Sequence, residues 1–225
     1  MKRIQLVVFD LDGTIIDSEW AHEVAKSKIC KELGVTQEIP LSKYTGRSNR
    51  LFWTDMLVMM GQTGDVDELV KQQFAIVLDE LHKASQLESA GLTMLLQFLK
   101  EHGITLGVSS GSEKHFIQAI LDYLNISEYF DFMVTGNDIV HLKPAPDIYL
   151  AALKVSKIQS EFALAVEDSK AGCQAAKAAG LLCIGYSNHG NNPQNLSDAT
   201  YRIDDMREAM LLFVKQEEEE GLWIW

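Results

Sequence analysis

Cysteine and basic residues are scarce in this sequence of 225 residues. The three cysteines, Cys30, Cys173 and Cys183, are far apart and form no Cys-x-x-Cys pair, so neither a disulfide framework nor a zinc cluster is predicted. Lysine and arginine together number 20 against 32 aspartates and glutamates, which leaves a formal net charge of -12. Because a nucleic-acid-binding protein needs a basic surface to displace counterions from phosphates, we expect no nucleic-acid partner.

Long apolar runs are also lacking. After Met1, Lys2 and Arg3 the first apolar stretch is interrupted by Asp10 and Asp12, which is too early for the apolar region of a signal peptide. No later stretch is long enough to cross a bilayer. We therefore expect a cytoplasmic protein with reduced cysteines and no membrane partner.

The sequence has ample apolar residues for a core. Hydrophobic residues make up 47% and charged residues 23% of the chain, a composition that indicates a folded protein rather than a disordered one. We expect one main domain with a smaller one inserted. The negative net charge does not exclude a small anionic substrate, because a bound divalent cation and a few lysine or arginine side chains reverse the potential locally.

Short apolar runs alternate with helical patterns over most of the chain. The runs predict strands, which lie at residues 4–9, 104–109, 132–135, 162–166, 182–186 and 201–203. Helices are predicted between most of them, at residues 92–101, 114–124, 148–155 and 171–179, with Gly103 and Gly180 at two helix exits. This order predicts an α/β fold with an open, parallel, Rossmann-like sheet, helices on both faces, and a ligand site at the carboxyl ends of the strands.

Two segments stand outside this alternation. Residues 17–87 have helical periodicity and no convincing strand, so we expect a small α-helical cap there, inserted into a core of residues 1–16 and 88–225. Near the C-terminus, four glutamates at 217–220 indicate a solvated helix end. Trp223 and Trp225 follow, and we expect them to fill an apolar groove of this chain rather than bind a partner.

Asp10 and Asp12 follow the first predicted strand, separated by one residue and followed by Gly13 and Thr14. Two carboxyl groups placed in this way can divide the chemistry of phosphoryl transfer. One oxygen attacks phosphorus, while the other group protonates the leaving oxygen and later deprotonates water. An ordinary turn, common for any Asp-Gly pair, is the structural alternative.

Three further polar segments follow predicted strands. Residues 109–112, Ser-Ser-Gly-Ser, offer hydroxyl and backbone N–H groups to phosphate oxygens at a helix N-terminus. Lys143 can balance the charge of phosphate and nucleophile, and Asp147 is predicted to cap the next helix. Glu167 and Asp168 end an apolar strand and offer hard oxygen ligands that suit Mg²⁺. Taken singly, these are a serine N-cap, a surface lysine and a capping aspartate, but such alternatives do not explain the set.

Together these segments resemble the four signature motifs of the haloacid dehalogenase superfamily, which here read Asp10-Leu-Asp-Gly-Thr14, Ser110, Lys143-Pro144 and Glu167-Asp168. The helical insertion is similar to the small cap of the β-phosphoglucomutase-like and phosphoglycolate-phosphatase-like branch. The resemblance implies that Asp10 is the nucleophile and Asp12 the general acid and base. It also implies a set of ligands, namely Ser110, Gly111 and Lys143 for phosphate and Asp10, the Asp12 carbonyl, Glu167 and Asp168 for Mg²⁺.

The resemblance also bears on the reaction. The dehalogenases of the superfamily lack the second aspartate, because displacing halide needs no acid, so Asp12 indicates phosphoryl transfer. A β-phosphoglucomutase uses a histidine, an arginine and a lysine of its cap to bind a second phosphate. His22 matches the histidine, but Asn49 and Gln72 stand at the places of the arginine and the lysine. We predict a phosphatase with an aspartyl-phosphate intermediate, with a phosphomutase as the alternative and a non-catalytic binding protein as a third, less favoured reading.

The cap and one loop of the core supply candidates for substrate binding, which are His22, Gly46, Arg47, Asn49, Arg50 and Ser112. Solvated arginines and a surface or capping His22 are the alternatives. The arginines favour a sugar phosphate or a phosphorylated acid as the small-molecule substrate of a monomer or homodimer. Trp20 and Trp53 are expected to pack within the cap.

Overall fold

The computed structural model describes residues 4–35, 48–84, 88–188 and 194–220. The chain forms two compact units: one comprises Met1–Asp17 and Glu88–Trp225, and the other Ser18–Leu87. Gly46, Arg47, Trp223 and Trp225 lie outside the described residues, so the expectations for them stay predictions.

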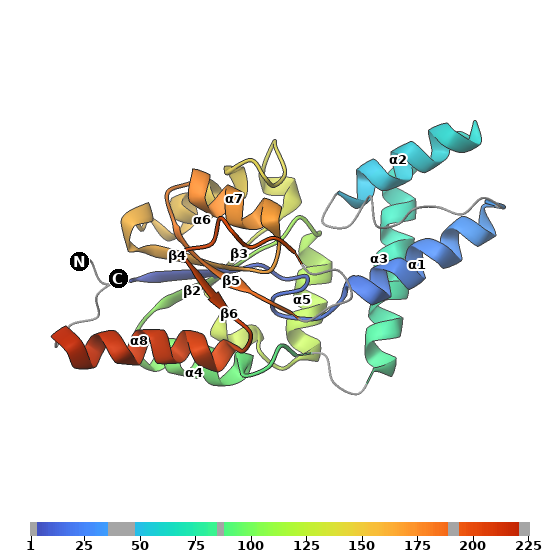
Figure 1. Ribbon diagram of the computed structural model, residues 1–225. Helices are drawn as coiled ribbons and strands as arrows, with labels where there is room; N and C mark the ends of the chain where they lie inside the picture. Colours follow the sequence, from blue (N-terminus) through green and yellow to red (C-terminus); the bar gives the residue numbers. More distant parts are fainter. Residues whose placement is uncertain (1–3, 36–47, 85–87, 189–193, 221–225) are drawn as a thin grey trace. The chain divides into compact units, whose positions relative to one another are not determined.

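The larger unit is built on a sheet of six parallel strands (Figure 1). These are β1 (Leu6–Phe9), β2 (Thr105–Ser109), β3 (Phe132–Val134), β4 (Ala163–Glu167), β5 (Leu182–Tyr186) and β6 (Tyr201–Ile203). They lie in the order β3-β2-β1-β4-β5-β6, and each neighbouring pair is parallel. The predicted α/β fold with an open parallel sheet is confirmed. β1 and β4 are almost wholly apolar because helices cover both faces of the sheet.

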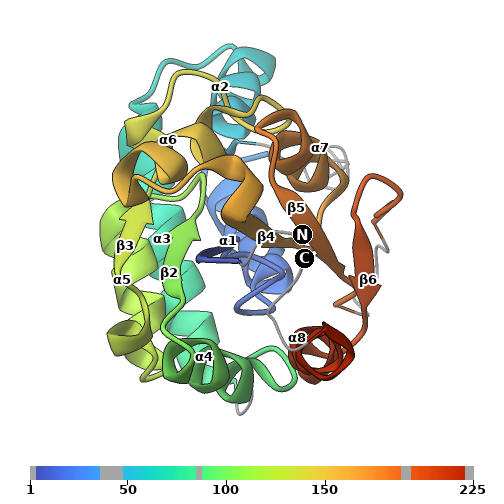
Figure 2. The same ribbon diagram turned by 90° about the vertical axis from the view of Figure 1, so that its left-hand side faces the viewer.

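Helices connect these strands and cover the two faces. They are α4 (Leu92–Glu101), α5 (Lys114–Tyr123), α6 (Asp147–Ser156), α7 (Lys170–Ala178) and α8 (Met206–Glu220). Short 3-10 helices occur at η2 (Ser127–Tyr129), η3 (Gly136–Asp138) and η4 (Ser160–Phe162). Figure 2 shows α6 and α7 on one face of the sheet and α4 and α8 on the other.

The pleat of the strands decides which side chains face α6 and α7. Leu6 and Val8 of β1, together with Ala163 and Ala165 of β4, belong to the buried cluster that α6 and α7 cover. Because side chains alternate along a strand, Asp10 and Glu167 continue these two rows. The sheet therefore directs both carboxyl groups toward the α6 and α7 layer.

The smaller unit contains α1 (Glu19–Glu32), α2 (Asn49–Met60) and α3 (Val66–Lys83), and its described residues form no strand, as their apolar spacing predicts. α3 packs against both α1 and α2. It begins at Asp65, whose carboxylate accepts hydrogen bonds from the backbone N–H groups of Asp67 and Glu68 at 2.9 and 3.3 Å. Across the described ranges of the chain, no helix combines the length and the apolar character needed to span a membrane.

Candidate active site

The loop after β1 brings Asp10 and Asp12 to the carboxyl edge of the sheet. The backbone N–H of Asp10 donates to the Val166 carbonyl at 3.0 Å and so extends the pairing of β1 with β4 by one residue. Gly13 follows with a φ of +84°, and a Cβ atom there would lie 2.1 Å from Oδ2 of Asp168. Glycine is therefore required both by the backbone conformation and by the close approach of a carboxylate.

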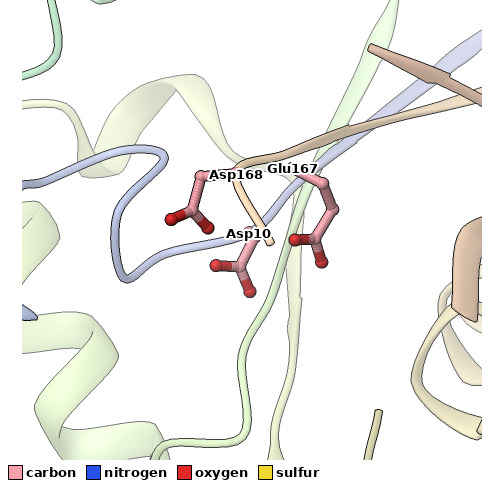
Figure 3. A group of neighbouring side chains, drawn as sticks. All are labelled: Asp10, Glu167 and Asp168. Atoms are coloured by element: carbon pink, nitrogen blue, oxygen red, sulfur yellow. The ribbon is translucent and has the colours of Figure 1, made fainter. Parts of the chain in front are cut away.

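Three carboxyl groups meet where β1 and β4 end (Figure 3). Asp10, Glu167 and Asp168 each offer an oxygen, and these oxygens all lie within 4.8 Å of one another. Asp12 adds a fourth carboxyl group close to Asp10, and among the described residues the Lys143 ammonium group pairs with Asp10 and Glu167. An all-oxygen donor set with excess negative charge fits a hard divalent cation.

Lys143 links two of these carboxylates from the loop before α6. Its mostly buried ammonium group forms ion pairs with Asp10 and with Oε1 of Glu167, the latter at 2.6 Å. Burial would lower the pKa of Lys143, but the charges of Asp10 and Glu167 outweigh it and raise that pKa. Burial also raises the pKa of Asp10 to about 8, with Lys143 opposing and Glu167 and Asp12 adding to the rise.

Glu167 is fully buried, and besides its ion pair with Lys143 its carboxylate accepts hydrogen bonds from two hydroxyl groups. The Tyr149 hydroxyl of α6 donates to Oε1 at 2.6 Å, and the Ser169 hydroxyl donates to Oε2 at 3.1 Å. On α7, a Cβ atom at Gly172 would lie 1.9 Å from the carboxyl carbon, so only glycine leaves room for the acid. The sequence gives a signal for Gly172, because a glycine inside a helix weakens it unless packing requires one.

The loop after β2 holds Asp12 from the other side. The hydroxyl groups of Ser110 and Ser112 donate to Oδ2 of Asp12 at 3.5 and 3.3 Å. The backbone N–H of Ser112 donates to the Ser110 hydroxyl at 3.1 Å. Neither serine caps α5, whose N-cap residue is Glu113, so the alternative of an ordinary serine N-cap is wrong.

Two further capping assignments are settled by the structure. Pro146 is the N-cap residue of α6, and the predicted cap Asp147 is already helical; its carboxylate turns back to accept the backbone N–H of His141 at 3.0 Å. The prediction for Asp147 was therefore wrong. At α7 the N-cap is Ser169, whose hydroxyl accepts the N–H of Gly172, so the capping alternative for Asp168 is also wrong.

Two more residues at this edge were not singled out from the sequence. The side-chain amide of Asn188, just after β5, donates to Oδ2 of Asp168 at 3.1 Å and to the Gly13 carbonyl at 3.3 Å. Gly136 of η3 packs so closely on Gly111 that a Cβ atom there would lie 2.5 Å from the Gly111 carbonyl oxygen. Both contacts join loops that follow different strands, so neighbouring sequence carries no sign of them.

The smaller unit contains a separate polar cluster. Gln73, fully buried on α3, donates through Nε2 to Nδ1 of His22 at 2.8 Å and to Oδ1 of Asn49 at 3.0 Å. Its Oε1 accepts the indole N–H of buried Trp53 at 2.8 Å, which confirms that Trp53 packs inside this unit.

The other polar residues considered for the cap lie on its surface. Arg50 forms an ion pair with Asp67, and both side chains are more than half exposed. Gln72 donates to Glu32 at 2.9 Å, also on the surface, while its neighbour Gln73 takes the central buried place. The substrate-binding roles considered for His22, Asn49 and Arg50 stay predictions.

A family model described as haloacid dehalogenase-like hydrolase matches residues 7–186, which include Asp10, Asp12, Ser110, Lys143, Glu167 and Asp168. The chain belongs to this family.

Named relatives of this haloacid dehalogenase-like hydrolase include phosphoglycolate phosphatase from Pseudomonas putida, which is 28% identical over 211 residues covering 90% of this chain and 77% of that protein. The crystal structure of CbbY from Rhodobacter sphaeroides in complex with xylulose-(1,5)bisphosphate is 25% identical, covers 91% of this chain and 96% of that one, and has a TM-score of 0.77. β-Phosphoglucomutase from Clostridium difficile shares the fold with a TM-score of 0.80 at 23% identity, over 97% of this chain and 98% of that one. The predicted superfamily, and a phosphatase as the class of enzyme, are confirmed.

Proposed function

We propose that this haloacid dehalogenase-like hydrolase is a Mg²⁺-dependent phosphatase that removes phosphate from a small metabolite through an aspartyl-phosphate on Asp10. One observation carries the proposal: Asp10 pairs with the Lys143 ammonium group and lies beside the carboxylates of Glu167 and Asp168, and Asp12 accepts hydrogen bonds from two serine hydroxyls. The Asp10 carboxylate is therefore close both to a cationic group and to the other carboxylates that could bind a metal ion. The phosphatase names of its relatives support the same reaction class.

The donor set fits Mg²⁺, and the residues proposed to hold it are Asp10, Glu167, Asp168 and the Asp12 carbonyl. When bound, the cation would offset the negative charge of the phosphate and of the surrounding carboxylates. Without such a charge the described residues of the site offer four carboxyl groups and the ammonium group of Lys143, a balance that disfavours the approach of a phosphate dianion.

The chain's own residues perform the remaining steps. A carboxylate oxygen of Asp10 forms a bond to phosphorus while the bond from phosphorus to the leaving oxygen breaks, and Asp12 gives its proton to that oxygen. Asp12, now ionised, takes a proton from water as the water oxygen attacks phosphorus, and the bond between phosphorus and the Asp10 oxygen breaks, which releases phosphate and the Asp10 carboxylate. Lys143, the Ser110 hydroxyl and the Gly111 N–H bind the phosphate oxygens.

The proposed substrate is a sugar phosphate or a phosphorylated acid. Two comparisons favour this size and chemistry, because one relative is named for phosphoglycolate and one similar structure holds a pentulose bisphosphate. We also propose a reducing, cytoplasmic setting, which is supported by the buried free thiols of Cys30, Cys173 and Cys183.

The test is a screen of phosphate release from phosphorylated sugars and acids with Mg²⁺, with and without excess chelator. We expect turnover of at least one substrate with Mg²⁺ and its loss on chelation. Full activity in chelator, after metal content has been checked, would contradict the metal assignment. A parallel assay for interconversion of glucose 1-phosphate and glucose 6-phosphate tests the phosphomutase alternative, and interconversion without net phosphate release would replace the proposal by that activity.

A further inference from the structure

The contacts of Glu167 single out Tyr149 as a residue that serves the site without lying at the end of a strand. Tyr149 is fully buried in the first turn of α6, and Glu167 is fully buried at the end of β4. We propose that Tyr149 is a positioning residue whose hydroxyl fixes the Glu167 carboxylate for cation binding and whose ring supports the Lys143 ammonium group. This role rests on the proposed metal site.

The position of Tyr149 follows from the pleat of the sheet. Glu167 shares its row with Ala163 and Ala165, which face α6 and α7, and these alanines are small enough for both helices to approach closely. α6 brings the Tyr149 hydroxyl to Oε1, and α7 leaves space for the carboxylate at Gly172. The acid thus packs between α6 and α7, where water is excluded from these two sides and the protein supplies the hydrogen bonds there.

Hydrogen-bond capacity explains what the hydroxyl contributes. An ionised carboxylate has about four lone-pair sites. Lys143 and Tyr149 use two of them on Oε1, and the Ser169 hydroxyl uses one on Oε2. These three donors from different elements fix the orientation of the carboxylate, and about one site is left for a cation.

The phenol of Tyr149 is a suitable donor to Glu167 because it carries no charge. A second cationic donor on Oε1 would compete with a metal ion for the carboxylates, whereas the neutral O–H group stabilises the ionised acid without adding positive charge. The ring has a separate contact, since the Lys143 nitrogen lies 5.5 Å from its centroid, within the range of a cation–π interaction. Tyr149 therefore contacts both Lys143 and Glu167, and a phenylalanine would keep the ring contact while removing only the donor.

The experiment measures cation binding to the substrate-free protein, with Mn²⁺ as the probe and electron paramagnetic resonance as the readout. Loss of a hydrogen-bond partner of a metal ligand typically weakens metal binding about 10–100-fold, so we expect Tyr149→Phe to raise the Kd for Mn²⁺ by a factor in this range. Tyr123→Phe, on the last residue of α5, is the matched control and should leave the Kd unchanged. Circular dichroism establishes that each variant is folded.

A double-mutant cycle shows whether the hydroxyl acts through Glu167. Glu167→Gln alone should weaken Mn²⁺ binding, and adding Tyr149→Phe to it should change the Kd by less than about threefold, because the carboxylate that the hydroxyl orients is already gone. An unchanged or lower Kd in Tyr149→Phe, or full additivity in the double variant, would overturn the inference. Absence of Mn²⁺ binding to the wild-type protein would overturn both the inference and the proposed metal site.

Discussion

The two units both bury polar side chains, but they do so in different ways. In the larger unit, Asp10 and Glu167 are buried next to Asp168 and Asp12, and the ammonium group of Lys143 pairs with Asp10 and Glu167. In the smaller unit, buried Gln73 meets neutral partners that match its donors and its acceptor. An excess of buried negative charge is costly and is relieved by protonation or by a bound cation, whereas hydrogen bonds between neutral groups involve no such charge.

In the cluster around Gln73, each hydrogen bond joins a defined donor and a defined acceptor. The indole N–H of Trp53 can only donate, so the oxygen of Gln73 faces it and the amide nitrogen faces His22 and Asn49. Nδ1 of His22 must then accept, which places the proton of the neutral imidazole on Nε2. Gln73 is thus the shared hydrogen-bond partner of Trp53, His22 and Asn49.

Among the substitutions considered, we expect the largest loss of activity at Asp10, which lies in the group of buried carboxylates. Asp10→Asn removes the carboxylate proposed as the nucleophile, so turnover of any phosphate ester should fall below detection while the fold persists. Steady-state phosphate release and circular dichroism check this. Hydrolysis of a phosphorothioate ester made chiral with ¹⁶O and ¹⁸O, run in ¹⁷O water, should also proceed with net retention at phosphorus, because two displacements occur, and inversion would contradict the covalent step.

Asp12→Asn should have a smaller effect that depends on the leaving group. General acid and base catalysis contributes about 10²–10⁴-fold, so turnover of an alkyl phosphate should fall within this range. An aryl phosphate needs little protonation of its leaving oxygen, so the first step should survive as a burst of phenol. Hydrolysis should then lag, and hydroxylamine-labile phosphate should accumulate on the protein. Steady turnover of the aryl ester at the wild-type rate would contradict the role of Asp12.

The close packing of α7 against Glu167 predicts the next effect. Gly172→Ala improves helix propensity by up to about 1 kcal/mol, but the new methyl group would overlap the carboxylate, and overpacking of this kind costs about 1–3 kcal/mol. We therefore expect a net loss of unfolding free energy together with weaker Mn²⁺ binding. Chemical denaturation and cation titration measure the two effects. Ala178→Gly, at the exposed end of α7, reports helix propensity alone and should leave cation binding intact.

The smallest effect on chemistry is expected in the smaller unit. Gln73→Leu leaves Trp53, His22 and Asn49 without their shared partner, and each unsatisfied buried group costs about 1–3 kcal/mol of stability. Thermal unfolding should show this loss, while kcat for a small aryl phosphate should change by less than about threefold. A large fall in kcat with an unchanged Tm would instead show that the Gln73 cluster takes part in catalysis. The two units would then not differ in the way described above. Gln72→Leu, on the surface beside it, is the control.

The sequence predicts the sheet and the motif residues well because both depend on local patterns. Runs of buried apolar residues locate the strands, and polar residues at strand ends meet at one edge of a parallel sheet, so Asp10, Lys143 and Glu167 could be expected together. The predicted fourth strand at 162–166 is shifted by one residue, because Phe162 belongs to η4 and Glu167 completes β4.

Residues whose partners come from another element were missed. Tyr149, Gly172 and Asn188 reach the site only through the packing of α6, α7 and the loop after β5, and no local spacing shows that packing. Asp147 was assigned as a cap because its residue type suits that position. Pro146, with its fixed φ, already occupies the N-cap, and the carboxylate of Asp147 binds upstream of the helix instead.

The two junctions of the helical unit have an evolutionary consequence. Ile16 pairs with Glu88 as an antiparallel bridge, and the Ser89 N–H donates to the Ile15 carbonyl at 3.2 Å, all within the larger unit. The chain thus leaves that unit and returns to it at adjacent points, as the two sides of a hairpin do. A segment inserted between such points can be lengthened, shortened or exchanged during evolution without changing the order of the strands, so the residues at the strand ends stay in place.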